Sequence, residues 1–282
     1  MRVFRPLNLL IVAVLQLLTY YFLDFDVTNR TWLNPEIWML IASSVLVCAA
    51  GYLINDWFDI DADRINKPHK LYADGWSKTA VWTTYSVFNA IALLLLFLID
   101  PMLMSWFIGV IALLLIYSLW LKRLPLIGNF AVSMLAAFSV YVVFMAFETQ
   151  SRNLVIFFAS FAALLTYVRE LVKDMEDLDG DAQVGYKTFP VIAGIRQAKS
   201  VANLTSVFIL VAYTNLMLQW VIPSFGTPVK YVVIAYQVLC VVVPILALIY
   251  FIMKAKHKDD FRRISLLTKY IMATGMASML FF

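Results

Sequence analysis

Aspartates at the same four relative positions recur in two segments of the chain. The segments are NDWFDIDAD at 55–63 and KDMEDLDGD at 173–181, and corresponding aspartates lie 118 residues apart. The shared pattern, Asp-x-x-Asp-x-Asp-x-Asp, is rich in the oxygen ligands that a hard divalent cation prefers. Mg²⁺ in particular takes one or two carboxylates and shares its other positions with water and substrate phosphates. We interpret the segments as two halves of one magnesium and diphosphate site.

Helical geometry divides these polar residues by face. At about 100° per residue, two sets each share one face and are expected to line a cavity, namely Asn55, Asp56, Asp59 and Asp63, and Glu170, Asp174, Asp177 and Asp181. The remaining acids are expected to face the cytosol, namely Asp61, Glu176 and Asp179. Stacked carboxylates repel and oppose the dipole at a helix C-terminus, each by a few tenths to about 1 kcal/mol. A bound cation would remove this cost, whereas a solvated helix cap, the plainer interpretation, does not explain the matched spacing.

Basic residues near the two segments are candidates for neutralising phosphate charge. They are Arg64, Lys122, Arg123, Lys173 and Lys187. The alternative for each one is an ordinary basic loop on the cytoplasmic side. Together with the acidic segments and an apolar surround, they predict a site for a diphosphate that carries a hydrocarbon tail.

The composition indicates which elements must position this site. Hydrophobic residues make up 63% of the chain and charged residues 14%, and the mean hydropathy is +0.83. These values lie outside the range of soluble domains and predict an all-α, polytopic membrane protein with no nucleic-acid partner. Nine runs are long enough to cross a bilayer, at 7–23, 37–55, 79–99, 102–121, 128–147, 154–173, 201–222, 230–253 and 265–282.

The distribution of Lys and Arg predicts the orientation in the membrane. With nine spans, 18 of the 22 Lys and Arg residues fall on one side, which also holds both acidic segments. Because basic loops stay in the cytoplasm, we expect a cytoplasmic N-terminus and active-site cap and a C-terminus on the opposite side. The repeated spacing further suggests one domain over 1–282 with an internal duplication, whose half-sites lie near 55–63 and 174–181.

The two segments and their flanks resemble a known family. NDWFDIDADRINKP at 55–68 resembles the Asn-x-x-x-Asp-x-x-x-Asp signature of the UbiA superfamily of intramembrane prenyltransferases. RELVKDMEDLDGDAQVGYKTFPVIAG at 169–194 is similar to the second acidic motif of that family. RPLN at 5–8 and LKRLPLIGN at 121–129 also resemble family positions, so the resemblance covers most of the chain.

The resemblance implies a bundle of nine helices around a central cavity with a cytoplasmic cap. It implies Mg²⁺ as the cofactor, held by Asn55, Asp59, Asp63, Asp174, Asp177 and Asp181. The residues expected to be catalytic are Asp59, Asp63, Asp177 and Asp181. Those expected to bind the diphosphate are Arg64, Lys122, Arg123, Lys173 and Lys187.

The implied activity is Mg-dependent transfer of a prenyl group from a prenyl diphosphate to a membrane-associated acceptor. The form RELxKDxEDxxGD resembles geranylgeranylglyceryl phosphate geranylgeranyltransferases, which favours a glyceryl phosphate ether lipid precursor as the acceptor. An aromatic acceptor of quinone or tetrapyrrole biosynthesis is the alternative. A cation-coupled transporter, from another class, would normally place ionisable residues near the bilayer midplane, whereas these acids lie at one membrane face. A CDP-alcohol phosphatidyltransferase would require Gly where Ile60 and Leu178 stand.

Overall fold

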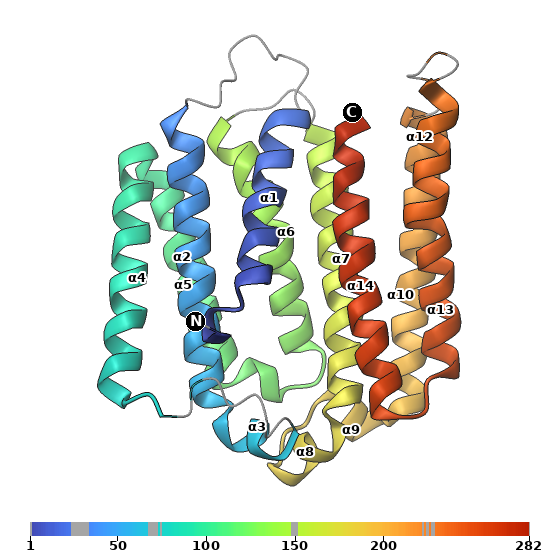
Figure 1. Ribbon diagram of the computed structural model, residues 1–282. Helices are drawn as coiled ribbons and strands as arrows, with labels where there is room; N and C mark the ends of the chain where they lie inside the picture. The colour runs from blue at the N-terminus through green and yellow to red at the C-terminus, as the bar shows by residue number, and fades with distance from the viewer. Residues whose placement is uncertain are drawn as a thin grey trace.

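The protein is a bundle of long helices that run roughly parallel to one another, with short helices gathered at one end (Figure 1). The structure is a computed structural model that describes residues 2–23, 34–66, 73, 75–147, 152–221, 223, 226 and 229–281. Positions 67 and 68 of the first acidic motif lie outside the described residues. Within that part, eight helices are long and apolar enough to cross a membrane. The predicted all-α, multi-pass architecture is confirmed, and a count of nine spans requires the 17-residue helix α1 as well.

The helices follow one another in nearly every part of the described chain. They are α1 (Pro6–Phe22), α2 (Pro35–Phe58), α3 (Ile60–Asn66), α4 (Lys78–Ile99), α5 (Pro101–Leu119), α6 (Ile127–Phe147), α7 (Arg152–Glu176), α8 (Leu178–Gln183), α9 (Phe189–Ala193), α10 (Ile195–Leu216), α12 (Val229–Gln237), α13 (Val243–Lys254) and α14 (Lys258–Ala277). Single 3₁₀ turns lie at Arg2–Phe4, Leu121–Arg123 and Ser278–Phe281. π-Helical segments lie at Met217–Val221 and Val238–Val242, and the second ends two residues before Pro244 in the first turn of α13.

Local sequence explains where several spans begin. The Asn34 side chain accepts a hydrogen bond from Glu36 N, directly before Pro35 at the first helical position. Asp100 ends α4 and caps α5, accepting from Met102 N at 2.9 Å. Capping side chains and an N-terminal proline both suit the free amides of a first helical turn. The short Asp100 connection therefore makes α4 and α5 antiparallel neighbours.

Helices α2 and α7 form the interior of the bundle. In their most apolar stretches 61% and 67% of the residues are buried, against 22% for α4 and 17% for α5. Helix α7 packs against α6, α10 and α14, while α2 packs against α1, α4 and α5. Since the acidic segments begin in the last turns of α2 and α7 and continue beyond them, the two most enclosed candidate spans carry the two halves of the predicted site to the same end of the bundle (Figure 1).

The helix boundaries repeat at the same offset as the aspartates. Adding 118 to the bounds of α2 gives 153–176, and α7 covers 152–176. The same shift takes α3 to 178–184, where α8 covers 178–183, and takes α4 to 196–217, where α10 covers 195–216. These matches favour the internal duplication, which stays a prediction, and they leave α14 without a counterpart in the first half.

Candidate functional site

Both acidic segments cross a one-residue break between helices. Asp59 is the only residue between α2 and α3, with φ −98° and ψ 1°. Asp177 is the only residue between α7 and α8, with φ −97° and ψ 7°. The Asp59 amide donates to Asn55 O at 3.0 Å, and the Asp177 amide donates to Lys173 O at 2.8 Å. The chain therefore bends identically at the two matched aspartates.

The bends bring the two segments together. Helix α3 contacts α8 at one end of the bundle (Figure 1). The Tyr186 phenol lies near both segments, because the carboxylates of Asp59 and Asp181 both act on it electrostatically. Residues separated by more than a hundred positions thus share one site.

Lys122 is the cation at the first half of this site. Its Nζ lies 2.6 Å from Asp59 Oδ1 and donates to Asn55 Oδ1 at 3.5 Å. Asn55 Nδ2 in turn donates to Asp59 Oδ2 at 2.9 Å. The Lys122 side chain is only 7% exposed. Burial lowers the pKa of Lys122, while the Asp59 carboxylate acts in the opposite direction. Two predicted metal ligands therefore already face a positive charge.

The second half is organised by groups from neighbouring helices. Asn129 Nδ2 donates to Asp174 Oδ2 at 2.8 Å, and Asp181 is buried at 8% exposure. The Arg123 guanidinium lies 5.2 Å from the centroid of the Tyr186 ring. Burial and then the Asp59 carboxylate raise the pKa of Tyr186 to about 12, although Arg123 opposes this shift. Tyr186 is therefore a neutral hydrogen-bonding group near pH 7.

A glycine allows these cations to reach the acidic groups. A Cβ on Gly128 would lie 2.7 Å from Leu121 O and 2.9 Å from Lys122 Cα. The first turn of α6 can therefore pack against the Leu121–Arg123 turn only because residue 128 has no side chain. Leu126, in the same connection, has φ 61°, which is strained for a residue with a Cβ. This close packing directs Lys122 and Arg123 toward the site.

The other predicted phosphate ligands lie farther from the centre. Arg64 is 58% exposed and lies 3.6 Å from Asp61. Lys187 has an exposed side chain, and its backbone amide donates to Arg123 O at 3.0 Å. Lys173 Nζ donates to Glu170 Oε2 at 3.1 Å. Lys122, by contrast, contacts two predicted metal ligands, Asn55 and Asp59.

Two of the three acids expected to face the cytosol are exposed, whereas the third, Glu176, is half-buried, and two of the inner acids are engaged by cations. Asp61 and Asp179 are exposed, as predicted, and Asp63 is half-buried in the first turn of α3. Asp56 is buried, and its Oδ1 accepts from Arg5 Nη2 at 2.5 Å. Glu170 likewise accepts from Arg169 and Lys173. The assignment from helical periodicity treated each segment as one continuous helix. It could not include cations that come from distant helices.

The donor set fits Mg²⁺ chemically. The six predicted ligands offer only amide and carboxylate oxygens, the atoms that this ion prefers. Across the described residues, no three His, Cys, Asp or Glu side chains converge closely enough to hold a metal ion by themselves. Mg²⁺ does not require such a cage, because water and substrate phosphates complete its shell. The Lys122 ammonium between Asn55 and Asp59 also indicates an environment suited to positive charge.

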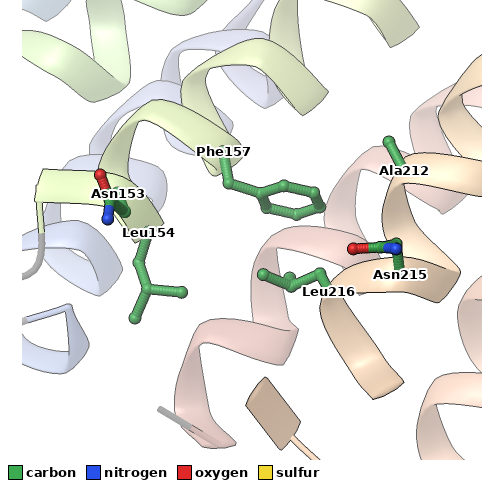
Figure 2. A pocket seen from close by; sticks show the side chains of 6 residues that line it. All are labelled: Asn153, Leu154, Phe157, Ala212, Asn215 and Leu216. Atoms are coloured by element: carbon green, nitrogen blue, oxygen red, sulfur yellow. The ribbon is translucent and has the colours of Figure 1, made fainter. Parts of the chain in front are cut away.

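Two hollows lie away from the acidic segments. One of about 210 Å³ is lined by α7 and α10, with Phe157 and Leu216 facing each other across it and Asn153 at its edge (Figure 2). A second, of about 220 Å³, continues along the same pair of helices past Phe157. Asn153 belongs to the first turn of α7, whereas the acidic segment begins in its last turn. We therefore assign the chemistry to the acidic segments rather than to these apolar hollows.

Sequence reasoning missed three polar groups of the site. Asn129 was included only within a weak motif, although an amide in the first turn of an apolar helix is itself a signal. Tyr186 stands inside the second motif. Tyr117 had no distinguishing signal among 14 tyrosines, yet Asp59, Asp174 and Glu170 all act on it electrostatically. It therefore lies where the two halves of the site meet.

The amino-acid sequence is similar to those of known proteins. A model of the UbiA prenyltransferase family matches residues 13–272. The digeranylgeranylglyceryl phosphate synthase of Pyrococcus abyssi is 34% identical over 169 residues, which cover 59% of this chain and 60% of that protein. The match thus spans less than two thirds of that relative. The synthase of the same name from Methanothermobacter thermautotrophicus is 29% identical over 288 residues, covering 96% of this chain and 91% of that protein.

Solved structures share the fold along nearly the whole chain. A structure of digeranylgeranylglyceryl phosphate synthase aligns with a TM-score of 0.70 at 20% identity, covering 99% of this chain and 96% of that one. A UbiA homologue from Archaeoglobus fulgidus bound to GPP and Mg²⁺ aligns with a TM-score of 0.68 at 16% identity, covering 99% and 98%. At these identities the likeness establishes the arrangement of the helices.

Proposed function

The chain belongs to the UbiA prenyltransferase family, and from this premise we propose that it transfers a prenyl group from a prenyl diphosphate to a hydroxyl of a glyceryl phosphate ether lipid precursor. The observation that carries the proposal is the meeting of α3 and α8, where Asp59 and Asp181 both act electrostatically on Tyr186. Two acidic segments at one end of an apolar bundle suit a substrate with a charged head and a hydrocarbon tail.

The reaction exchanges one bond to carbon for another. The bond between the allylic carbon and the diphosphate oxygen breaks, the acceptor hydroxyl oxygen bonds to that carbon, and the hydroxyl proton leaves to solvent or to the released diphosphate. Negative charge develops on the leaving diphosphate, so positive groups around it lower the barrier. Lys122 and Arg123 supply that charge from the turn before α6. No nucleophilic side chain is required.

The metal-binding residues of the proposal are Asn55, Asp59, Asp63, Asp174, Asp177 and Asp181. When bound, Mg²⁺ would supply Lewis-acid stabilisation of the diphosphate oxygens. The cations proposed to share the diphosphate charge are Arg64, Lys122, Arg123, Lys173 and Lys187. The A. fulgidus homologue with GPP and Mg²⁺ supports this choice of metal and of donor.

The proposed class of acceptor is supported by the names of two related proteins. The P. abyssi and M. thermautotrophicus proteins are both named digeranylgeranylglyceryl phosphate synthase, which favours a glyceryl phosphate lipid. An aromatic acceptor is the remaining alternative. A matrix of prenyl diphosphates of several lengths against glyceryl phosphate ethers and aromatic acids, assayed by lipid extraction, tests the assignment.

Removal of the metal is the most direct test of the mechanism. We expect EDTA to lower transfer by about two to three orders of magnitude, the equivalent of several kcal/mol of transition-state stabilisation. Added Mg²⁺ should restore the rate. Full turnover in EDTA would contradict the metal, and turnover only with aromatic acids would contradict the acceptor.

We also propose that the acidic end of the bundle faces the cytoplasm. The excess of Lys and Arg at that end supports this orientation. In a chain with Cys48 and Cys240 replaced by Ser, Gly226→Cys should react with an impermeant maleimide on intact cells, whereas Lys256→Cys should react only after permeabilisation. Both positions are exposed. The reverse labelling pattern would contradict the orientation.

A further inference from the structure

Lys269 is a charged residue in the middle of a candidate membrane span. It is the twelfth residue of the 24-residue span Lys258–Phe281. Its Nζ donates to the neutral Asn8 Oδ1 at 3.3 Å, and among the described residues no ion pair joins it to a carboxylate. A lysine inside a membrane is costly and ordinarily faces a partner or a functional cavity. The proposed prenyl-transfer site, as described so far, does not use it.

The charges nearest to Lys269 increase this cost. Arg169, Lys173 and Arg5 all act on its ammonium as like charges, and Glu170 is the opposing one. Glu170 is already engaged by Arg169 at 2.5 Å and by Lys173 at 3.1 Å. Asp56 is similarly engaged by Arg5. The cations around Lys269 therefore outnumber the carboxylates that engage them, and this excess of positive charge is complementary to a phosphate group.

The fold holds these cations in place. Helices α7 and α14 run antiparallel and pack closely, since a Cβ on Gly275 would overlap the Phe161 ring (Figure 1). That contact places Lys269 beside the C-terminal part of α7, which carries Arg169. Arg5 has a left-handed φ of 49°, and its guanidinium lies 4.8 Å from the centroid of the Tyr52 ring. A strained residue held by an ion pair and a ring indicates a preorganised position.

The cations adjoin the acidic site without merging with it. The Tyr117 phenol interacts electrostatically with three carboxylates, those of Glu170, Asp59 and Asp174, and with the guanidinium of Arg5. It therefore lies within reach both of the acidic segments, which suit a metal-bound diphosphate, and of the cations around Arg5. In a glyceryl phosphate the free hydroxyl lies only a few covalent bonds from the phosphate. A phosphate among these cations would thus direct that hydroxyl toward the donor.

We propose that Arg5, Asn8, Arg169 and Lys269 form the site that binds the phosphate of the acceptor lipid. This inference rests on the proposed function, and it specifies the residues that bind the phosphate of the acceptor. Arg and Lys bind phosphate oxygens through charge-assisted hydrogen bonds, and basic pockets between membrane helices suit lipid head groups. The two anionic substrates then occupy separate regions of opposite charge.

The test compares Lys269→Met with Lys269→Arg in the full-length protein in detergent micelles. Loss of one charge-assisted contact, about 1.5–3 kcal/mol, should raise the acceptor KM roughly 10- to 100-fold and leave the donor KM within about twofold. Lys269→Arg should restore most of the affinity. Arg262→Met, an exposed change on the same helix, should alter neither constant. A rise in donor KM alone, or no rise in acceptor KM, would overturn the proposal.

A binding measurement separates this inference from the proposed activity. We expect glycerol 1-phosphate to raise the melting temperature of the wild-type protein, and this shift to be lost in Lys269→Met. The loss would support a phosphate site even if no glyceryl lipid were prenylated. Inorganic phosphate serves as the second probe. Stabilisation that it produces equally in wild type and Lys269→Met, with no effect of glycerol 1-phosphate, would contradict the site.

Discussion

Replacing Asp59 with Asn should lower kcat for prenyl transfer on the order of a thousandfold. Asp59 stands at the bend between α2 and α3, where its carboxylate meets both Asn55 and Lys122. An amide keeps the shape but removes the negative charge that a divalent cation requires. Loss of one electrostatic group at a developing charge typically costs about two to three orders of magnitude. Steady-state kinetics at saturating donor, acceptor and Mg²⁺ measures the effect.

The matched control for this change is Asp61→Asn. Asp61 belongs to the same segment but is 90% exposed and contacts Arg64 at 3.6 Å, so we expect less than a threefold change in rate. Asp177→Asn, at the equivalent bend, should reproduce the large loss. A melting temperature measured for each variant distinguishes lost chemistry from lost folding, since Lys122 also loses a charged partner. Similar losses at Asp59 and Asp61 would refute the assignment.

Replacing Arg5 with Ala should destabilise the protein by about 3–5 kcal/mol. The Asp56 side chain is only 3% exposed, and Arg5 is its ion-pair partner at 2.5 Å. Removing one member of such a pair leaves a buried charge uncompensated, which is the costly case for buried ion pairs. Asp56 Oδ2 already has no hydrogen-bond partner among the described residues, so loss of the guanidinium takes away the hydrogen bond that Oδ1 accepts. Unfolding by denaturant in mixed micelles measures the loss.

Two further variants test the cause of this destabilisation. In the Arg5→Ala background, Asp56→Asn removes the stranded charge and should recover part of the stability. Arg64→Ala removes an exposed partner of Asp61 and should cost less than about 1 kcal/mol, as surface ion pairs do. If Arg5→Ala were as mild as Arg64→Ala, the pair would have no structural role.

Much of the architecture followed from the sequence, because each span is a local property. A run of about 20 apolar residues must satisfy its backbone hydrogen bonds within itself when it enters a bilayer, so it becomes a helix wherever its neighbours lie. The matched aspartate spacing likewise identified the two segments that α3 and α8 bring together. The outward positions of Asp61 and Asp179 followed from helical periodicity alone. The family resemblance was confirmed by the family match over residues 13–272.

The tertiary structure decided which charges meet. Asp56 and Asp59 are three residues apart and were assigned to one face, yet one pairs with Arg5 and the other with Lys122. The bends at Asp59 and Asp177 end the periodicity on which that assignment relied. Lys269 was a single charge in an apolar run until α7 and α14 placed it among other cations. The environment of a charge depends on helices far away in the sequence, so local pattern determines the spans and packing determines the electrostatics.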